Sequence, residues 1–166
     1  MHDHGIAHRD IKPENIVLHD GRWKLIDWDF CSPLEEFVHC GTEAFMCKHA
    51  MTKQWEGSPA DSSRRADVYA FGKLVFCIIM ATACRQFIEP YKKLMKMFQS
   101  DYISSHSIKL PAAWQDWLDL AVACCAKQPP IKIPPLPATV ENTSVAKDTA
   151  TCSTSLQVVL ADPTFA

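Results

Sequence analysis

A long apolar run between residues 68 and 84 constrains the fold of this 166-residue chain more than any other feature. Such a run is either a membrane span or a helix that is buried on most sides. It is short for a bilayer, Gly72 and Lys73 interrupt it, and the charged segment 64–67 comes directly before it. We therefore predict a core helix that begins after this charged segment, and no membrane partner.

Two further helices are predicted where apolar side chains recur at helical spacing after Pro90 and after Pro111. We interpret each apolar stripe as core packing and each charged face as a solvated surface. The first stripe consists of Tyr91, Leu94, Met95 and Phe98, opposite Lys92, Lys93 and Lys96. The second consists of Trp114, Trp117, Leu118, Ala121, Val122 and Cys125, with Gln115, Asp116 and Asp119 outside.

Strand signals are confined to the first third of the chain. Residues 15–18 and 23–26 flank Asp20-Gly21, which is the strongest short signal for a β-hairpin. After Cys125 the composition becomes rich in Pro and then in Thr, Ser and Ala. We expect a mainly α (α+β) fold with one or two small β-hairpins over residues 1–134, and a mostly disordered tail over 135–166.

Composition excludes some function classes. Seventeen Lys and Arg against nineteen Asp and Glu give a net charge of -2, which lacks the basic footprint of a nucleic-acid-binding protein. The eight cysteines form no Cys-x-x-Cys pair and no apolar leader precedes them, so we expect reduced thiols in a cytoplasmic or nuclear protein. A zinc site built on His2, His4, His39 and Cys40 is disfavoured, because their spacing is not that of structural zinc ligands.

The densest group of reactive side chains is His8-Arg9-Asp10-Ile11-Lys12-Pro13-Glu14-Asn15, directly before the predicted hairpin. The hairpin would return Asp27 toward Asn15. Two carboxylates, an ammonium and an amide would then share a small volume. Phosphoryl transfer needs this set, because one group orients the attacking hydroxyl while others hold Mg²⁺ and neutralise phosphate charge.

His8-Arg9-Asp10, followed by Lys12 and Asn15, resembles the catalytic loop of the eukaryotic protein kinases. Three further stretches fit the same family. Residues 24–29 resemble its metal-binding motif, residues 41–46 the end of its activation segment, and residues 67–72 the start of the central helix of its large lobe. We find no Gly-rich loop, no Val-Ala-Ile-Lys lysine and no partner glutamate, so the resemblance implies a large-lobe fragment without the small lobe.

The resemblance also implies roles for individual residues. Asp10 would orient the substrate hydroxyl, Lys12 would steady the γ-phosphate of ATP, and Asn15 and Asp27 would bind Mg²⁺. Val17 would lie under the adenine ring.

A second set of residues would support the site. Asp67 would brace the backbone of His8 and Arg9. Lys12, together with Thr42 near the substrate hydroxyl, implies a kinase of the Ser/Thr type rather than a tyrosine kinase.

The sequence departs from the family pattern in the metal motif and in the segment that follows it. Trp28 and Asp29 replace the phenylalanine and glycine of the metal motif. Residues 37–39 carry no hydroxyl where the activating phosphate usually lies, so we expect Glu35 or Glu36 to neutralise Arg9 instead.

Two functions remain open at this point. The first is a partial protein serine/threonine kinase domain with protein substrates, ATP and Mg²⁺. The second is a truncated or pseudokinase-like interaction module that performs no catalysis. Because a small lobe or regulatory partner would cover the upper surface, we expect Val17 and Trp28 to be exposed and the isolated chain to be weakly active and poorly soluble.

Overall fold

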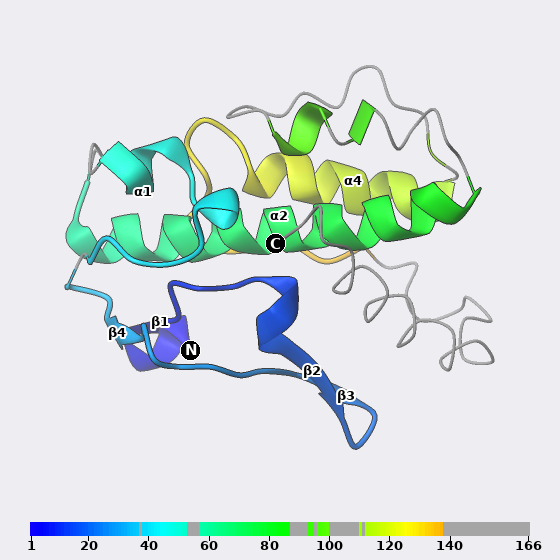
Figure 1. Cartoon of the computed structure of the whole chain (residues 1–166). Coiled ribbons are helices and arrows are strands. Elements are labelled where there is room, and N and C mark those ends of the chain that lie inside the picture. The colour runs from blue at the N-terminus through cyan, green and yellow to red at the C-terminus, as the bar shows by residue number, and fades with distance from the viewer. Residues whose placement is uncertain are drawn as a thin grey trace.

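The computed structural model describes residues 1–36, 38–52, 57–86, 93–94, 96–99, 110 and 112–137. In this part of the chain the long helix α2 forms a middle layer, with α1 and α4 on one side and the strands on the other (Figure 1). The helices are α1 (Lys48–Thr52), α2 (Pro59–Gln86) and α4 (Ala112–Cys124), with short 3-10 turns at His2–His4, Pro13–Asn15 and Glu43–Phe45. The strands are β1 (Ile6–Ala7), β2 (Ile16–His19), β3 (Arg22–Leu25) and β4 (Ser32–Pro33). The helix-rich α+β prediction is therefore confirmed.

Helix α2 contains the predicted core helix but begins nine residues before the apolar run, at Pro59 instead of residue 68. The early start has a local cause. Pro59 suits the first helical position, and the Ser58 hydroxyl accepts a hydrogen bond from the Asp61 N–H at 3.1 Å. The charged segment 64–67 is consequently helical, and this places Asp67 on the buried side of α2 with 2% exposure.

Helices α2 and α4 pack closely where α2 has Gly72. A Cβ at this position would lie 2.6 Å from Cys125 Sγ and 2.7 Å from Cys124 Cβ. The predicted stripe on α4 is confirmed: Leu118, Ala121 and Cys125 are buried, and Trp114, Trp117 and Val122 pack against the same cluster. Within the described part of the chain, no helix has the length and apolar character that a membrane crossing requires.

The predicted helix after Pro90 is described only in part, because Tyr91, Lys92 and Met95 lie outside the described residues. Residues 93–94 and 96–98 are helical. Leu94 is buried, Phe98 packs against the core, and Lys93 and Lys96 are exposed, as the pattern predicted. Of the predicted tail, residues 138–166 also lie outside the described residues.

The strands form two small antiparallel sheets, β2–β3 and β1–β4. The β2–β3 hairpin is confirmed with its strands one residue from the predicted bounds, and its turn residues Asp20 (φ 51°) and Gly21 (φ 69°) have the positive φ values of a tight hairpin turn. Strands β1 and β4 lie far apart in sequence and pair Ala7 with Ser32. This second pair ties the segment after residue 30 to the N-terminus.

Candidate active site

The carboxylate of Asp10 is the centre of the site and is 3% exposed. Its Oδ1 accepts hydrogen bonds from the Thr42 backbone N–H and hydroxyl, both at 2.8 Å. Its Oδ2 contacts the Lys12 ammonium at 2.8 Å and accepts from the Asn15 amide at 3.2 Å. Lys12, Asn15 and Thr42, which the sequence analysis singled out, thus all contact the Asp10 carboxylate.

These contacts set the charge of Asp10. Burial opposes ionisation, but the hydrogen bonds from Lys12 and Thr42 outweigh it and hold the pKa of Asp10 below its usual 3.8. The group is therefore a carboxylate at neutral pH. Such a group can accept and orient a hydroxyl proton.

Lys12 bridges two elements that are distant in sequence. Besides Asp10, its ammonium reaches the Thr42 hydroxyl at 2.9 Å, and its side chain keeps 22% exposure. The ammonium is therefore held at the rim of the site, where it can meet a ligand from solvent. The Thr42 hydroxyl donates a hydrogen bond to Asp10 and accepts one from Lys12, so it acts as both donor and acceptor.

Asn15 and Asp27 are the predicted metal ligands. The Asn15 amide nitrogen also donates to the Asp10 carbonyl at 2.8 Å, which turns the amide oxygen away from Asp10. The Asn15 carbonyl accepts from the Ile26 N–H at 2.9 Å, so the hairpin brings the chain back beside Asn15 one residue before Asp27. Asp27 has a φ of 61° and is exposed, and it makes no hydrogen bond to the described residues.

An amide oxygen and a carboxylate fit a Mg²⁺ site. Mg²⁺ prefers oxygen ligands and commonly takes only one or two carboxylates, with phosphate and water completing its shell. In the described part of the chain no group of three His, Cys, Asp or Glu side chains could hold a metal by itself. A cation bound by Asn15 and Asp27 would thus depend on a phosphate ligand.

Asp67 braces loop 8–15 from α2. Its two carboxylate oxygens accept from the backbone N–H of His8 at 2.9 Å and of Arg9 at 2.8 Å. The contact that the resemblance implied is therefore present. A third donor, the ring N–H of His2, reaches the same carboxylate at 2.9 Å.

His8 links the loop to the metal motif. Its Nε2–H donates to the Ile26 carbonyl at 3.1 Å and its Nδ1 accepts from the Asp10 N–H at 3.3 Å, which requires the neutral ring. The Trp28 ring meets it edge-on, with centroids 4.8 Å apart. Trp28 is still 44% exposed as predicted, whereas the expectation for Val17 is wrong, because it is half-buried in the hairpin.

The prediction that Glu35 or Glu36 neutralises Arg9 is wrong. The Arg9 guanidinium meets the main-chain carbonyl of Glu36, and no ion pair joins it to the carboxylate of Glu35 or Glu36 in the described part of the chain. Its other acceptors are the Ser32 hydroxyl at 2.8 Å and two more carbonyls. Neutral oxygens satisfy this cation, and the two glutamates do not.

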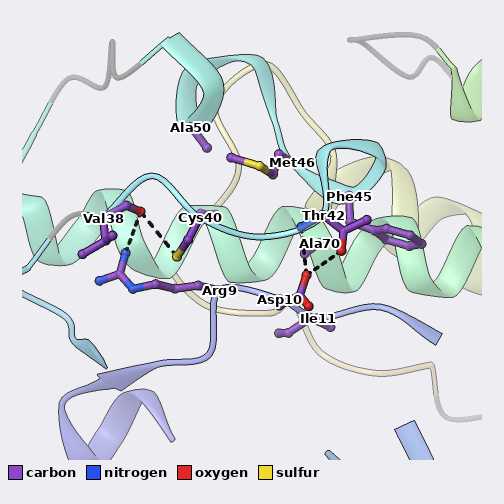
Figure 2. A pocket seen from close by; sticks show the side chains of 11 residues that line it. Arg9, Asp10, Ile11, Val38, Cys40, Thr42, Phe45, Met46, Ala50 and Ala70 are labelled. Carbon is purple, nitrogen blue, oxygen red and sulfur yellow. Dashed lines mark hydrogen bonds between the residues drawn. The ribbon is translucent and has the colours of Figure 1, made fainter. Parts of the chain in front are cut away.

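A small pocket lies between loop 8–15 and the segment 38–46 (Figure 2). Its volume is about 20 Å³, the space of a single water molecule. Figure 2 shows the Asp10 carboxylate turned toward Thr42, and Arg9 turned toward the Val38 carbonyl. Burial raises the pKa of the Cys40 thiol that lines the pocket, so this cysteine is no activated nucleophile.

Sequence reasoning missed three residues that shape the site. His2 was weighed only as a zinc ligand and Ser32 was not considered. Gly41 has a φ of 114°, and a Cβ there would lie 2.3 Å from the Arg9 carbonyl oxygen. An isolated glycine directly before Thr42 was the available signal for such a close backbone approach.

Comparison with known proteins agrees with this geometry. A family model described as "Protein kinase domain" matches residues 1–133. CBL-interacting protein kinase 16 of Oryza sativa is 28% identical over 110 residues, covering 61% of this chain and 23% of that protein. Dual specificity protein kinase TTK of Mus musculus is 28% identical over 152 residues, covering 82% of this chain and 17% of the other.

A third relative, the probable serine/threonine-protein kinase KKQ8 of Candida glabrata, is 34% identical over 90 residues, which are 48% of this chain and 11% of KKQ8. The chain thus spans about a quarter or less of the length of these relatives. The match over residues 1–133 covers most of the 166 residues, and the chain therefore belongs to the protein kinase family.

Proposed function

We propose that this chain carries the phosphoryl-transfer site of a serine/threonine protein kinase, with ATP and Mg²⁺ as cofactors and a protein hydroxyl as acceptor. The observation that carries the proposal is the buried Asp10 carboxylate, which Lys12, Asn15 and Thr42 hold in place with four hydrogen bonds. A carboxylate fixed in this way is preorganised to orient a hydroxyl.

In the proposed reaction Asp10 accepts the hydrogen bond of the substrate hydroxyl and takes up its proton as the oxygen attacks the γ-phosphorus. The Lys12 ammonium, 2.8 Å from Asp10, is placed to meet the transferring phosphoryl group beside that hydroxyl. Mg²⁺, bound by Asn15 and Asp27, would neutralise charge on the phosphates. Val17, on strand β2, would pack under the adenine ring.

Specificity for Ser and Thr is proposed from the resemblance, because Lys12 and Thr42, which are in contact at 2.9 Å, are the residues expected at these positions in a kinase of the Ser/Thr type. One relative is named a serine/threonine kinase and another a dual specificity kinase, so the names alone do not decide the acceptor. Phosphorylation of peptides that differ only in Ser, Thr or Tyr at the acceptor position would distinguish Ser/Thr specificity from dual specificity.

The surroundings of the site lead to further proposals. We place the domain boundary near residue 134 and propose a small lobe or regulatory partner above the hairpin, where Trp23 is 53% and Trp28 44% exposed. The cysteines at positions 31, 40, 47, 77, 124 and 125 are free thiols, which suits the reducing cytoplasm or nucleus.

A second candidate function is an interaction module without catalysis. It is favoured by the same exposed aromatic side chains and by Asp29 in place of the glycine of the metal motif. Large exposed apolar side chains commonly mark a protein contact surface. This candidate predicts binding of a partner without any effect of ATP.

Nucleotide binding separates the two candidates. The melting temperature of the full chain is measured with and without Mg²⁺–ATP, for the wild type, Asp27→Asn and the neighbouring control Asp29→Asn. The kinase proposal predicts a Mg²⁺-dependent rise that Asp27→Asn abolishes and Asp29→Asn retains. No rise in the folded wild type, or an equal rise in all three proteins, would refute it.

A further inference from the structure

We propose that residues 133–137, Ile-Pro-Pro-Leu-Pro, form a docking motif for a protein domain that binds polyproline II helices in a groove lined by aromatic side chains. This binding does not depend on catalysis by the chain. The match to the kinase family ends at residue 133, so the motif lies at and beyond the end of the matched region.

The first observation is the arrangement of the prolines in the motif. Residues 134, 135 and 137 are prolines, and Ile133 and Leu136 each directly precede one. A proline fixes its own φ at about −65° and disfavours the helical conformation of the residue before it. All five residues are therefore restricted to extended or polyproline II backbone, and residues 129–137 contain neither helix nor strand. The motif thus has the shape that an aromatic groove recognises before a partner binds, which lowers the entropic cost of binding.

The second observation is the exposure of the side chains in the motif, which follows a period of three residues. Ile133 and Leu136 are 44% and 61% exposed, whereas Pro134 and Pro137 are half-buried. A polyproline II helix has three residues per turn, so positions i and i+3 lie along one edge. The two large apolar side chains therefore share an edge that solvent reaches. A groove of aromatic rings can bury both of them together.

The third observation is the point at which the segment leaves the core. Pro129 is fully buried, and its carbonyl accepts a hydrogen bond from the guanidinium of Arg65 on α2. The exposed fraction of the Ile and Leu side chains then rises along the segment, from 39% at Ile131 to 61% at Leu136. The segment is therefore attached to the domain at its start and presents its apolar side chains outward, where a globular partner can approach.

The charges beside the motif indicate the polarity of the partner. Lys127 and Lys132 are exposed, and residues 126–137 include no acidic side chain. We therefore expect acidic side chains at the rim of the aromatic groove. Two lysines fall short of the basic cluster that holds a protein on an anionic membrane, so the charge favours a protein partner.

The motif is tested first as a synthetic peptide of residues 129–139. The peptide is titrated into a panel of isolated, ¹⁵N-labelled SH3 and WW domains, and binding is followed by NMR. The control peptide carries Pro134→Ala and Pro137→Ala. We expect at least one domain to bind the native peptide in its aromatic groove, and to bind the control at least about tenfold more weakly. Binding of the native peptide by none of these domains would overturn the proposal.

The full chain is then titrated into the domain that binds the peptide, because the folded protein must present the motif. We expect the same groove resonances to shift, and the peptide to compete with the chain. Leu136→Ala and Ile133→Ala should each weaken binding about tenfold, since each removes a side chain that the groove buries. The matched control is Ile131→Ala, which is 39% exposed but lies outside the motif and should bind like the wild type.

Three results would overturn the proposal at this stage. A full chain that fails to bind the domain, although its peptide binds, would show that the folded protein covers the motif. Equal weakening by Ile131→Ala and Leu136→Ala would show that residues 133–137 are not the recognised unit. Unchanged binding of the chain to a domain whose groove tryptophan is replaced by alanine would place the contact elsewhere. The melting temperature of each variant shows whether its fold is retained.

Discussion

Asp67 holds Arg9 in a left-handed backbone conformation: its carboxylate accepts the Arg9 N–H at 2.8 Å, and Arg9 has a φ of 71°. A residue with a side chain loses about 1–2 kcal/mol in this conformation. The brace comes from the first third of α2, a helix that the core holds firmly. Burial of the long helix thus fixes the geometry of loop 8–15, and with it the direction of both Arg9 and Asp10.

Removal of the brace should be strongly destabilising. In Asp67→Ala the buried N–H groups of His8 and Arg9 lose their acceptor, and each such loss amounts to about 1–3 kcal/mol. We expect the free energy of unfolding in urea to fall by at least about 2 kcal/mol. His2→Ala removes one contact from a side chain that is 21% exposed, so its loss should be about 1 kcal/mol or less. An equal loss for both variants would contradict the brace.

Gly41 should tolerate no side chain, because its Cβ would lie 2.3 Å from the Arg9 carbonyl oxygen. In Gly41→Ala we expect the Thr42 N–H to move off Asp10 and to lose its protection from hydrogen exchange. The free energy of unfolding should fall by about 2–4 kcal/mol, from the clash and the positive φ together.

The control for this prediction is Gly5→Ala. Gly5 also has a positive φ, 74°, but a Cβ there meets nothing within 4 Å. It should show only the backbone effect of about 1 kcal/mol, with the Thr42 N–H still protected. If the Thr42 N–H lost its protection from hydrogen exchange in both variants, the cause would be the positive φ of the glycine and not the contact of the new Cβ with Arg9.

The sequence predicted those features that depend on periodicity or on a local turn. The hairpin around Asp20-Gly21 and the buried face of α4 are of this kind. The dense motif 8–15 identified Asp10, Lys12 and Asn15, and the resemblance to the kinase family added Thr42; the fold brings these four residues together.

Contacts between distant segments were less predictable. The acceptors of Arg9 are mostly main-chain carbonyls, which carry no residue-specific signal, so a carboxylate was expected in their place. The predicted start of α2 was too late because the first two turns of the helix show no apolar periodicity. Ser58 and Pro59 are the residues that indicate the true start.

Gly72→Ala should destabilise the packing of α2 on α4 although alanine favours a helix. The gain in helix propensity is about 1 kcal/mol. Against it stands the clash of the new Cβ, 2.6 Å from Cys125 Sγ and 3.0 Å from the Ala121 carbonyl oxygen, and overpacking typically amounts to about 1–3 kcal/mol. We expect a net loss of about 1 kcal/mol in urea unfolding.

The exposed Ala123→Gly measures the helix propensity difference alone within the same pair of helices. Adding Cys125→Ala to Gly72→Ala should recover part of the loss, because it removes the nearest atom. A Gly72→Ala protein that is more stable than the wild type would show that α4 moves away freely.

Acid should weaken the protein through Asp10. Its folded pKa lies below the usual value because the bonds from Lys12 and Thr42 outweigh the effect of burial, so the folded state favours the charged form. The stabilisation is therefore present above the unfolded pKa of about 3.9 and is lost as the pH falls through the lower folded value.

At neutral pH Asp10→Asn should melt at a lower temperature than the wild type. The difference should narrow between about pH 5 and pH 3, since only the wild type loses a charge at this position. The control is Asp116→Asn, which changes an exposed carboxylate on α4 and should leave the pH profile of the melting temperature unchanged. A difference in melting temperature between wild type and Asp10→Asn that stays constant down to pH 3 would show that the charge of Asp10 does not stabilise the site.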